Sequence, residues 1–362
     1  MTKIVNILGA GLMGRMMALV LRKEGFNVHV FDKHSALSDH SAAYAAAAML
    51  APLAESVNTE ICVVEMGQYS LKRWPDILKT LSKPVYFQQN GTLLIWHQQD
   101  HSVAKHLGSQ LKTIHDHHPS LPKPEFVEDS RLHDLEPSLG TSFAQGIFLP
   151  EEGQLDNRGL LNSLLDESVK LGVNYHWNSP REISQFITTA NEWVVDCRGL
   201  GAKPSWEEIR GVRGEVIRIH APEVNLSRPV RLIHPRYPIY IAPKPGGIYV
   251  IGATEIESED LSPVSVRSTL ELLSAAYTVH SGFAEARILE SRAQCRPTLP
   301  DNLPALMRMS SKVLKINGLY RHGFMISPAV MDAALELIVH DSQTIADQFH
   351  IPVHQIDYAH LH

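Results

Sequence analysis

The strongest constraint on the fold comes from the first thirty-two residues, where short elements follow one another in a fixed order. Residues 3–8 are a short, mostly apolar run, and Gly9-Ala-Gly-Leu-Met-Gly14 follows at once. Residues 12–24 then carry apolar side chains at helical spacing, residues 28–31 read as a second strand, and Asp32 stands at its end. This order predicts a β-α-β unit of the Rossmann type that holds a dinucleotide.

Each glycine of this turn has a physical reason. Gly9 permits the tight turn, Gly11 lets the backbone approach a pyrophosphate, and Gly14 lets the helix pack against the strand. The free N–H groups at the helix start would face the phosphates. Asp32 is placed to accept hydrogen bonds from ribose hydroxyls. Its negative charge disfavours a cofactor with a 2′-phosphate, such as NADP. The motif alone leaves FAD and NAD open.

Length, charge and cysteine content exclude several classes. With 362 residues the chain is long enough for two domains of roughly 100–200 residues each. Its net charge of −6 provides no basic surface for nucleic acid or anionic lipid. The three cysteines are far apart and form no CxxC pair, so we expect no disulfide framework and no metal site, as suits the cytoplasm. The longest apolar stretch, residues 42–54, is shorter than the roughly 20 residues of a membrane helix, so no transmembrane segment is predicted.

A second segment is unusually rich in small residues. It reads Ser41-Ala-Ala-Tyr-Ala-Ala-Ala-Ala-Met-Leu-Ala-Pro-Leu-Ala-Glu55, and small side chains let a backbone press against a flat ring. An ordinary alanine-rich helix is an equally good explanation of this segment by itself. The segment resembles the second flavin-contacting segment of the D-amino-acid oxidase family, especially the glycine oxidases of thiamine biosynthesis. One departure is Ala48, because the family commonly has glycine before the methionine.

The resemblance continues in the same order through the rest of the chain. The matching segments are residues 153–161, 172–176, 193–202, 212–217, 234–243, 249–254, 292–301 and 318–328. A second departure is His322, where the family usually has asparagine.

The resemblance implies an α/β (α+β) fold with a Rossmann-type FAD-binding domain and a mainly antiparallel-sheet substrate domain. The FAD-binding domain would be discontinuous, and we assign the two domains as follows: residues 1–80, 145–212 and 295–362 bind FAD, and residues 81–144 and 213–294 form the substrate domain. Within the latter, Asn90-Gly91 predicts a hairpin and Gly246-Gly247 a turn between strands.

The resemblance also implies a noncovalent FAD site, because the cysteine and histidine positions used for covalent attachment are not recognised here. The expected cofactor-binding residues are Gly9, Gly11, Leu12, Met13, Gly14, Asp32, Lys33, Ala46, Ala47, Ala48, Met49, Arg181, Gly199, His322, Gly323, Phe324 and Met325. We further expect Ser327 to cap a helix with Pro328 in its first position, so that the helix amino end stabilises negative charge near flavin N1.

Three residues are the candidates for catalysis. A substrate carboxylate that is buried needs a partner, and Arg296, whose direction is restrained by the following proline, offers a planar fork. By resemblance, Tyr240 also reaches the carboxylate, and Arg321 stands beside substrate and flavin. The expected reaction is oxidative deamination of glycine, sarcosine or a small D-amino acid. Hydride would pass from Cα to flavin N5, and the products would be an oxo acid, ammonia and hydrogen peroxide.

Three alternatives stay open at this stage. The first is a dehydrogenase of the same fold that passes electrons to a quinone instead of oxygen. The second is an NAD-dependent dehydrogenase, which the glycine motif alone would allow. The third is a non-catalytic flavin-binding partner protein, which the departures at Ala48 and His322 would permit. The sequence is also compatible with a homo-oligomer.

Overall fold

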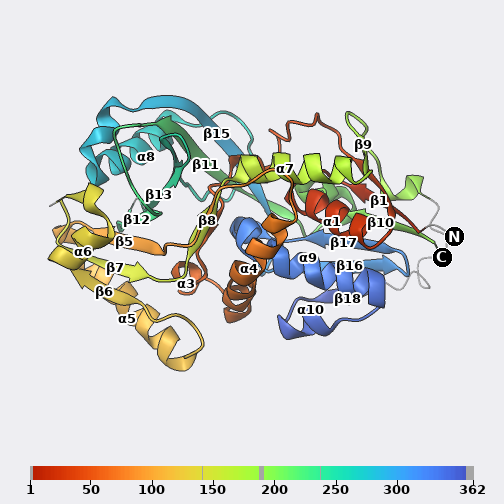
Figure 1. The fold of residues 1–362 in the computed structure, drawn as a ribbon, viewed down its shortest axis with the longest axis horizontal. Helices are drawn as coiled ribbons and strands as arrows, with labels where there is room; N and C mark the ends of the chain where they lie inside the picture. Colours follow the sequence, from red (N-terminus) through yellow and green to blue (C-terminus); the bar gives the residue numbers. More distant parts are fainter. Residues whose placement is uncertain (1–2, 141, 187–190, 237, 356–362) are drawn as a thin grey trace.

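Two β-sheets of different type form the two lobes of the molecule, as Figure 1 shows for a computed structural model of the chain. The structure describes residues 3–140, 142–186, 191–236 and 238–355. One lobe contains a seven-stranded sheet, the other an eight-stranded sheet, and a small three-stranded sheet runs between them. The predicted fold class is therefore confirmed.

The seven-stranded sheet carries the nucleotide motif. Its order is β18 (Val353–Gln355), β16 (Ala305–Ser310), β17 (Val313–Asn317), β10 (Glu192–Asp196), β1 (Ile4–Leu8), β2 (Asn27–Phe31) and β9 (Asn174–His176). β1 pairs in parallel with both β10 and β2, so their carboxyl ends meet at one edge of the sheet. The helices around this sheet are α1 (Leu12–Lys23), α4 (Ile61–Lys79), α7 (Asn157–Lys170) and α9 (Gly323–His340).

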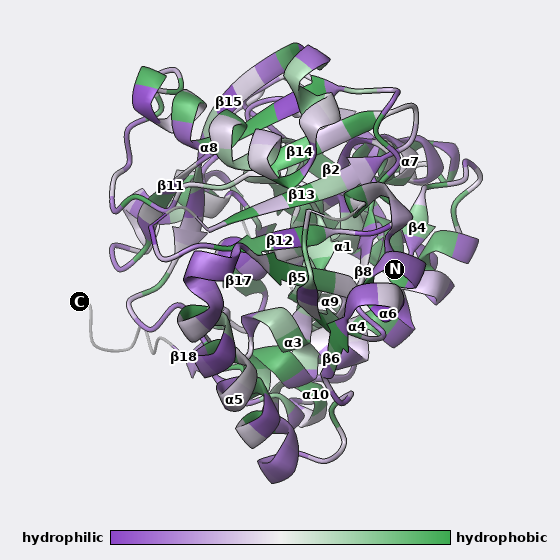
Figure 2. Cartoon of the chain, turned by 90° about the vertical axis from the view of Figure 1, so that its left-hand side faces the viewer, coloured by the Kyte–Doolittle hydropathy of each residue, from purple (hydrophilic) through white to green (hydrophobic). Residues whose placement is uncertain are grey.

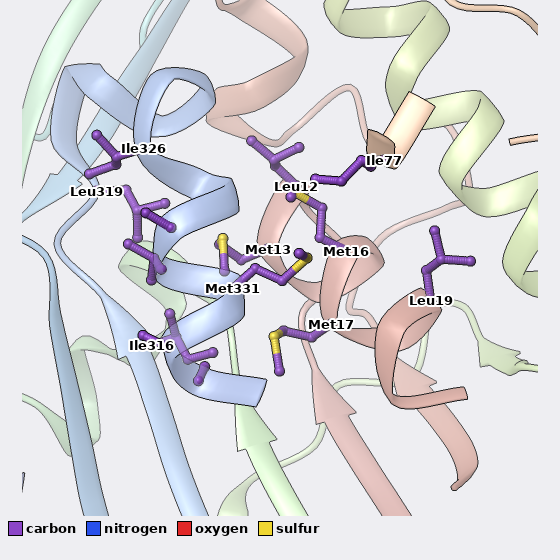
Figure 3. Close-up of a cluster of buried hydrophobic side chains, with 14 of the residues drawn as sticks. Leu12, Met13, Met16, Met17, Leu19, Ile77, Ile316, Leu319, Ile326 and Met331 are labelled. Atoms are coloured by element: carbon purple, nitrogen blue, oxygen red, sulfur yellow. The ribbon is translucent and has the colours of Figure 1, made fainter. Parts of the chain in front are cut away.

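The core of this lobe lies between α1 and α9. Figure 3 shows the methionines Met13, Met16 and Met17 of α1 directed toward Met331 of α9, all of them buried. Met is flexible and polarizable, which suits the irregular space between two helices. This packing places the amino ends of α1 and α9 near one another, at the same side of the sheet.

The eight-stranded sheet is mainly antiparallel. Its order is β15 (Arg287–Thr298), β11 (Arg210–His220), β14 (Ile248–Gly252), β13 (Ile239–Lys244), β12 (Val230–Ile233), β5 (Thr92–Trp96), β7 (Gln145–Leu149) and β6 (Glu125–Glu128). α8 (Val266–Val279) packs on one face. In Figure 2 the central strands of this lobe are mostly hydrophobic, whereas the outlying helix α5 (His101–His117) is largely hydrophilic. The division of the chain into the residue ranges given above stays a prediction.

The hairpin predicted at Asn90-Gly91 is wrong. β4 (Phe87–Gln88) pairs with β8 (Gly153–Leu155) in the small sheet, while β5 pairs with β7 and β12. The turn therefore carries the chain from one sheet to another, and the Gly91 N–H donates to the Glu152 carbonyl at 2.9 Å. The turn at Gly246-Gly247 does join the antiparallel neighbours β13 and β14, as predicted.

The start of the last long helix also differs from the prediction. α9 begins at Gly323, so Ser327 and Pro328 lie inside it and not at its cap. A proline in a helix cannot donate to the carbonyl four residues earlier, here that of Phe324. The Trp74 indole N–H donates to that carbonyl instead, at 3.0 Å, and both groups are buried. This contact explains why a strong start signal in the sequence does not mark the start of the helix.

One helical stretch, residues Tyr320–His340, is long and apolar enough to cross a membrane by length and composition. Within the described chain, 78% of its most apolar window is buried inside the protein. The stretch therefore has the burial pattern of a core helix.

Candidate active site

A cavity of about 1280 Å³ runs along the side where elements of both large sheets meet. Apart from Gly14, which lies behind the turn, all predicted site residues line it. The cavity is larger than the roughly 300–1,000 Å³ of ordinary small-molecule sites, which leaves room for a large cofactor and a small substrate. Which of these residues bind a ligand is still a prediction, but the fold brings them together.

The glycines of the first turn stand in three different environments. Gly9 has φ of +93°, and a Cβ there would lie 2.8 Å from the Cys197 carbonyl oxygen. A Cβ at Gly14 would lie 1.8 Å from the Gly9 carbonyl oxygen, so the helix and strand backbones touch. A Cβ at Gly11 would meet no atom closer than 3.9 Å, because this position faces the cavity. The backbone therefore leaves space for a ligand at Gly11 alone of the three.

The amino end of α1 is free to bind an anion. The first hydrogen bond of the helix runs from the Arg15 N–H to the Gly11 carbonyl at 3.0 Å, so the N–H groups of Leu12, Met13 and Gly14 have no partner within the helix. Leu12 and Met13 line the cavity. These groups suit a pyrophosphate.

Asp32 is held at the same end of the cavity. Its carboxylate accepts from the backbone N–H of Ala10 at 2.6 Å and of His34 at 2.8 Å. A carboxylate oriented by two backbone donors keeps lone pairs for the hydroxyls of a ribose. The arrangement agrees with the role expected for Asp32.

Sequence reasoning missed Arg15, which is fully buried behind this turn. Its guanidinium donates to the Ala10 carbonyl at 2.9 Å, to the Leu161 carbonyl at 2.7 Å and to the Ser38 hydroxyl at 2.6 Å. Burial lowers the pKa of Arg15. The only signal in the sequence was a charged residue among the apolar residues near the start of the helix, and its hydrogen bonds hold the turn in place.

The small-residue segment is not one alanine-rich helix. α2 (Ala42–Ala45) is a single turn, and the chain then runs into β3 (Met49–Leu50). The Asn157 side-chain amide donates to the carbonyls of Ala43 at 2.9 Å and Tyr44 at 2.8 Å. The segment is thus held along the cavity wall in an irregular conformation, with Ala45 to Met49 lining the cavity.

Ala48 adopts the left-handed backbone conformation, with φ of +53°. This conformation favours glycine, because in any other residue the Cβ atom comes too close to the carbonyl oxygen that follows it. The conformation gives a physical reason for the glycine that the resemblance leads one to expect here. Alanine is the smallest side chain that can replace it, so the departure does not disrupt the cavity wall.

Replacing Ala48 with glycine is therefore expected to stabilise the protein slightly. Relief of about 1–2 kcal/mol of backbone strain outweighs the about 0.5–1 kcal/mol that glycine costs through chain entropy. The measurement is the free energy of unfolding in urea. Ala46→Gly is the matched control, because Ala46 has φ of −62° and should lose stability on the same change. Equal destabilisation by both changes would contradict the strain at Ala48.

Arg296 lies at the other end of the cavity, on β15. Its guanidinium donates to the Thr254 carbonyl at 3.2 and 3.3 Å, and it stacks close to Gly214, where a Cβ would come within 2.4 Å of Nη2. None of the ion pairs among the described residues includes Arg296. The Thr254 carbonyl thus orients the Arg296 guanidinium, and no carboxylate of the described residues lies within 4.0 Å of it.

Tyr240 stands beside this arginine. It lies on β13, directly opposite Gly252 of β14 and Arg231 of β12. Burial raises the pKa of Tyr240, while the nearby charges of Arg296 and Arg231 act to lower it. The hydroxyl therefore stays protonated near neutral pH and can donate a hydrogen bond.

Arg321 is already paired with two carboxylates. Its Nε lies 3.1 Å from Glu55 Oε2, and its Nη1 lies 2.8 Å from Glu255 Oε2. His322 Nε2 lies 3.4 Å from the same Glu55 oxygen. Arg321 is thus in the cavity, as predicted, but its charge is balanced by protein side chains.

Glu55 also pairs with Arg231, a cavity residue that sequence reasoning missed. Its other oxygen pairs with Arg231, which lies on β12 and also lines the cavity. Burial acts to raise the pKa of Glu55, but Arg231, His322 and Arg321 outweigh it and hold the pKa well below its usual range. No local motif marks Arg231, because its importance comes only from pairing across to α3 (Pro52–Glu55).

The charges at this end of the cavity do not cancel. Arg231, Arg296 and Arg321 face only Glu55 and Glu255, which leaves one positive charge when the histidines are counted as neutral. The arginine without a carboxylate is Arg296. Arg296 is partly exposed and lines the cavity, so one negatively charged group of a ligand would balance it.

The amino end of α9 completes the cavity. Gly323, Phe324 and Met325 are its first residues and all line the cavity, so the positive end of the helix dipole faces inward. The helix starts five residues earlier than predicted, and its amino end lies where it would favour negative charge on a ligand in the cavity.

Comparisons with known proteins identify the family of the chain. Residues 5–336 match the family described as "FAD dependent oxidoreductase". A Rhizobium etli protein, provisionally named as the thiamine biosynthesis oxidoreductase ThiO, is 33% identical over 340 residues, covering 92% of this chain and 96% of its own length. The chain belongs to the FAD-dependent oxidoreductase family. It is an enzyme of that family and uses FAD, so the NAD-dependent alternative is wrong.

Solved structures show the same fold. Glycine oxidase from Bacillus cereus superposes with a TM-score of 0.78 at 21% identity, over 96% of this chain and 98% of its own. Iminodiacetate oxidase from Chelativorans sp. BNC1 superposes with a TM-score of 0.81 at 18% identity, over 96% of this chain and 99% of its own. At these identities the likeness concerns the fold.

Proposed function

We propose that this enzyme oxidises the amine of a small amino acid, with glycine or sarcosine first and small D-amino acids second. The observation that carries the proposal is Arg296, a cavity arginine that has no carboxylate within 4.0 Å among the described residues. One substrate carboxylate would neutralise it, and an arginine fork binds a carboxylate with two parallel hydrogen bonds. Tyr240, a neighbour with a protonated hydroxyl, would donate a third.

The cavity fits noncovalent FAD along its length. The turn at Gly11 and the free N–H groups of α1 would hold the pyrophosphate, Asp32 the ribose, and residues 45–49 one face of the flavin. FAD, when bound, would accept a hydride, that is one proton with two electrons, from the substrate Cα. The chain contributes orientation, with the carboxylate held on Arg296, and a helix end that favours negative charge.

The substrate is proposed to be small and singly charged. Because Arg321 and Arg231 are already paired with Glu55 and Glu255, a second substrate carboxylate would have to displace an existing ion pair. The similarity to a protein provisionally named ThiO supports thiamine biosynthesis as the pathway. The resemblance of residues 41–55 and 234–254 to glycine oxidases supports glycine as the first candidate. Oxygen is the proposed electron acceptor, which would make hydrogen peroxide, and a cytoplasmic location is the proposed setting.

The test is anaerobic bleaching of the flavin with glycine, sarcosine, D-alanine and L-alanine. Glycine has two Cα hydrogens, but with the carboxylate fixed on one side and the flavin on the other, only one hand of alanine presents its hydrogen to the ring. We expect D-alanine to bleach the flavin and L-alanine not to. Preference for L-alanine would refute this orientation.

Admission of air then separates the acceptors. Reoxidation with one peroxide for each substrate supports the oxidase, whereas bleached flavin that recovers only with an added quinone supports the dehydrogenase. A protein that holds FAD and is bleached by none of these amines would refute the proposed substrate class.

A further inference from the structure

The two side chains proposed to hold the substrate carboxylate both lie directly over glycines. A Cβ added at Gly214 would come within 2.4, 2.5 and 2.6 Å of Nη2, Cζ and Nη1 of Arg296. One added at Gly252 would come within 2.5 and 2.6 Å of the hydroxyl oxygen and Cζ of Tyr240. Carbon atoms that are not bonded pack best at about 3.5–4.0 Å. Any other residue at either position would therefore displace the side chain above it.

The two side chains reach these glycines from opposite directions. In the sheet order β15-β11-β14-β13, Arg296 stands on the first of these four strands and Tyr240 on the fourth. Gly214 and Gly252 lie on β11 and β14, the strands between them, and Figure 1 shows β15 and β11 side by side. The register places all four residues on one face of the sheet. The polar ends of Arg296 and Tyr240 therefore converge above the two middle strands.

The hydrogen bonds of Arg296 leave one edge of its guanidinium for a ligand. Nη1 and Nη2 both donate to the Thr254 carbonyl, at 3.3 and 3.2 Å, whereas Nε donates to none of the described residues. Nη2 also has a second N–H. Nε and Nη2 can thus make two parallel hydrogen bonds to a carboxylate. Lifting the guanidinium off Gly214 would break its bonds to Thr254 and turn this edge away.

The backbone itself does not require glycine at either position. Neither Gly214 nor Gly252 is among the described glycines with positive φ. Both lie in β-strands, where glycine is less stable than alanine. A glycine in a strand often marks a place where another group comes close to the backbone, and here these groups are Arg296 and Tyr240.

We propose that Gly214 and Gly252 are positioning residues for the substrate. They let Arg296 and Tyr240 lie against the sheet, and so fix where the carboxylate, and with it Cα, is held. The inference rests on the proposed function for the kind of ligand, a small monocarboxylate.

The first test measures acetate binding to the FAD-loaded protein by the absorbance of the bound flavin. Acetate presents a carboxylate but has no amine to oxidise. Gly214→Ala should raise the acetate dissociation constant about tenfold or more, because at least one charge-assisted hydrogen bond from Arg296 is lost. FAD content and the melting temperature should stay unchanged.

Gly211→Ala is the matched control. Gly211 is also buried on β11 without positive φ, and a Cβ there would lie 2.9 Å from Glu259 Cγ. This glycine lies away from the cavity, on the other face of the sheet. The variant should therefore bind acetate as the unchanged protein does. An equal loss of acetate affinity in Gly211→Ala and Gly214→Ala would overturn the proposal.

The second test is a double-mutant cycle, which separates positioning from general damage. Arg296→Lys keeps a charge for acetate but has no planar group over Gly214, so adding Gly214→Ala should change the affinity less than about two-fold. Gly252→Ala should likewise add little in a protein that carries Tyr240→Phe, because the hydroxyl is already gone. Additive losses, normal acetate affinity in both single glycine variants, or loss of FAD or folding in them would each overturn the proposal.

The outcomes separate this inference from the proposed function. Because acetate is not oxidised, its affinity does not depend on whether any amine bleaches the flavin. An unchanged protein that binds no acetate would refute the carboxylate site, and both proposals with it. Bleaching by glycine together with normal acetate affinity in Gly214→Ala would refute the positioning role alone.

Discussion

Protein with Gly11→Val should be folded and colourless. The position faces the cavity, its backbone has φ of −73° and ψ of −162°, which valine accepts, and no atom lies within 3.9 Å of an added Cβ. The valine side chain would instead occupy the space where the pyrophosphate is proposed to bind. We expect FAD affinity to fall at least about a hundred-fold, which corresponds to about 2.7 kcal/mol.

Gly14→Val is the contrasting variant. The added Cβ would lie 1.8 Å from the Gly9 carbonyl oxygen, so helix and strand must separate and the lobe should fail to fold. Released flavin absorbance measures cofactor content, and circular dichroism with thermal melting measures folding. Yellow Gly11→Val protein would show that the pyrophosphate does not pass this turn. Loss of folding in both variants would show that Gly11 is structural.

Local features of the chain were the ones that could be predicted. The turn at Gly9 to Gly14 and the acid at Asp32 depend on spacing along the sequence and on backbone conformation, and the cavity is built around them. Gly246-Gly247 likewise joins adjacent strands, because a turn between neighbours is a local event.

Features set by distant contacts could not be predicted. Ser327 and Pro328 are a strong helix-start signal, but Trp74, about 250 residues away, satisfies the carbonyl that the proline leaves free. Asn90-Gly91 has the residues of a hairpin, yet β4 pairs with β8 in the small sheet and β5 pairs with β7 in the eight-stranded sheet. In each case tertiary pairing decides between two locally acceptable conformations.

The ion pairs around Arg296 and Arg321 also depend on distant contacts and could not be predicted from the sequence. Arg296 and Arg321 both follow from resemblance, but the sequence does not tell which is free. Only the positions of Glu55 and Glu255 show that Arg321 is balanced and Arg296 is not. Arg231, which no motif marks, is needed to complete this balance.

Arg296→Leu should therefore weaken substrate binding while FAD stays in place. A charge-assisted hydrogen bond contributes about 1.5–3 kcal/mol, so the concentration of substrate that half-saturates flavin bleaching should rise about ten- to a hundred-fold. Arg296→Lys should restore only part of this loss, because lysine keeps the charge but lacks the fork. The FAD content of both variants should match that of the unchanged protein.

Arg321→Leu distinguishes the anchor from the balancing arginine. Removing Arg321 leaves Glu55 with Arg231 and His322, and leaves Glu255 without its arginine, so the site loses its surplus positive charge. Arg321→Lys keeps this charge and should therefore restore most of the binding, whereas Arg296→Lys restores only part because lysine lacks the fork. If both Arg296 variants bind substrate normally and Arg321→Leu does not, the carboxylate is held by Arg321, and the ion pair with Glu255 must open when substrate binds.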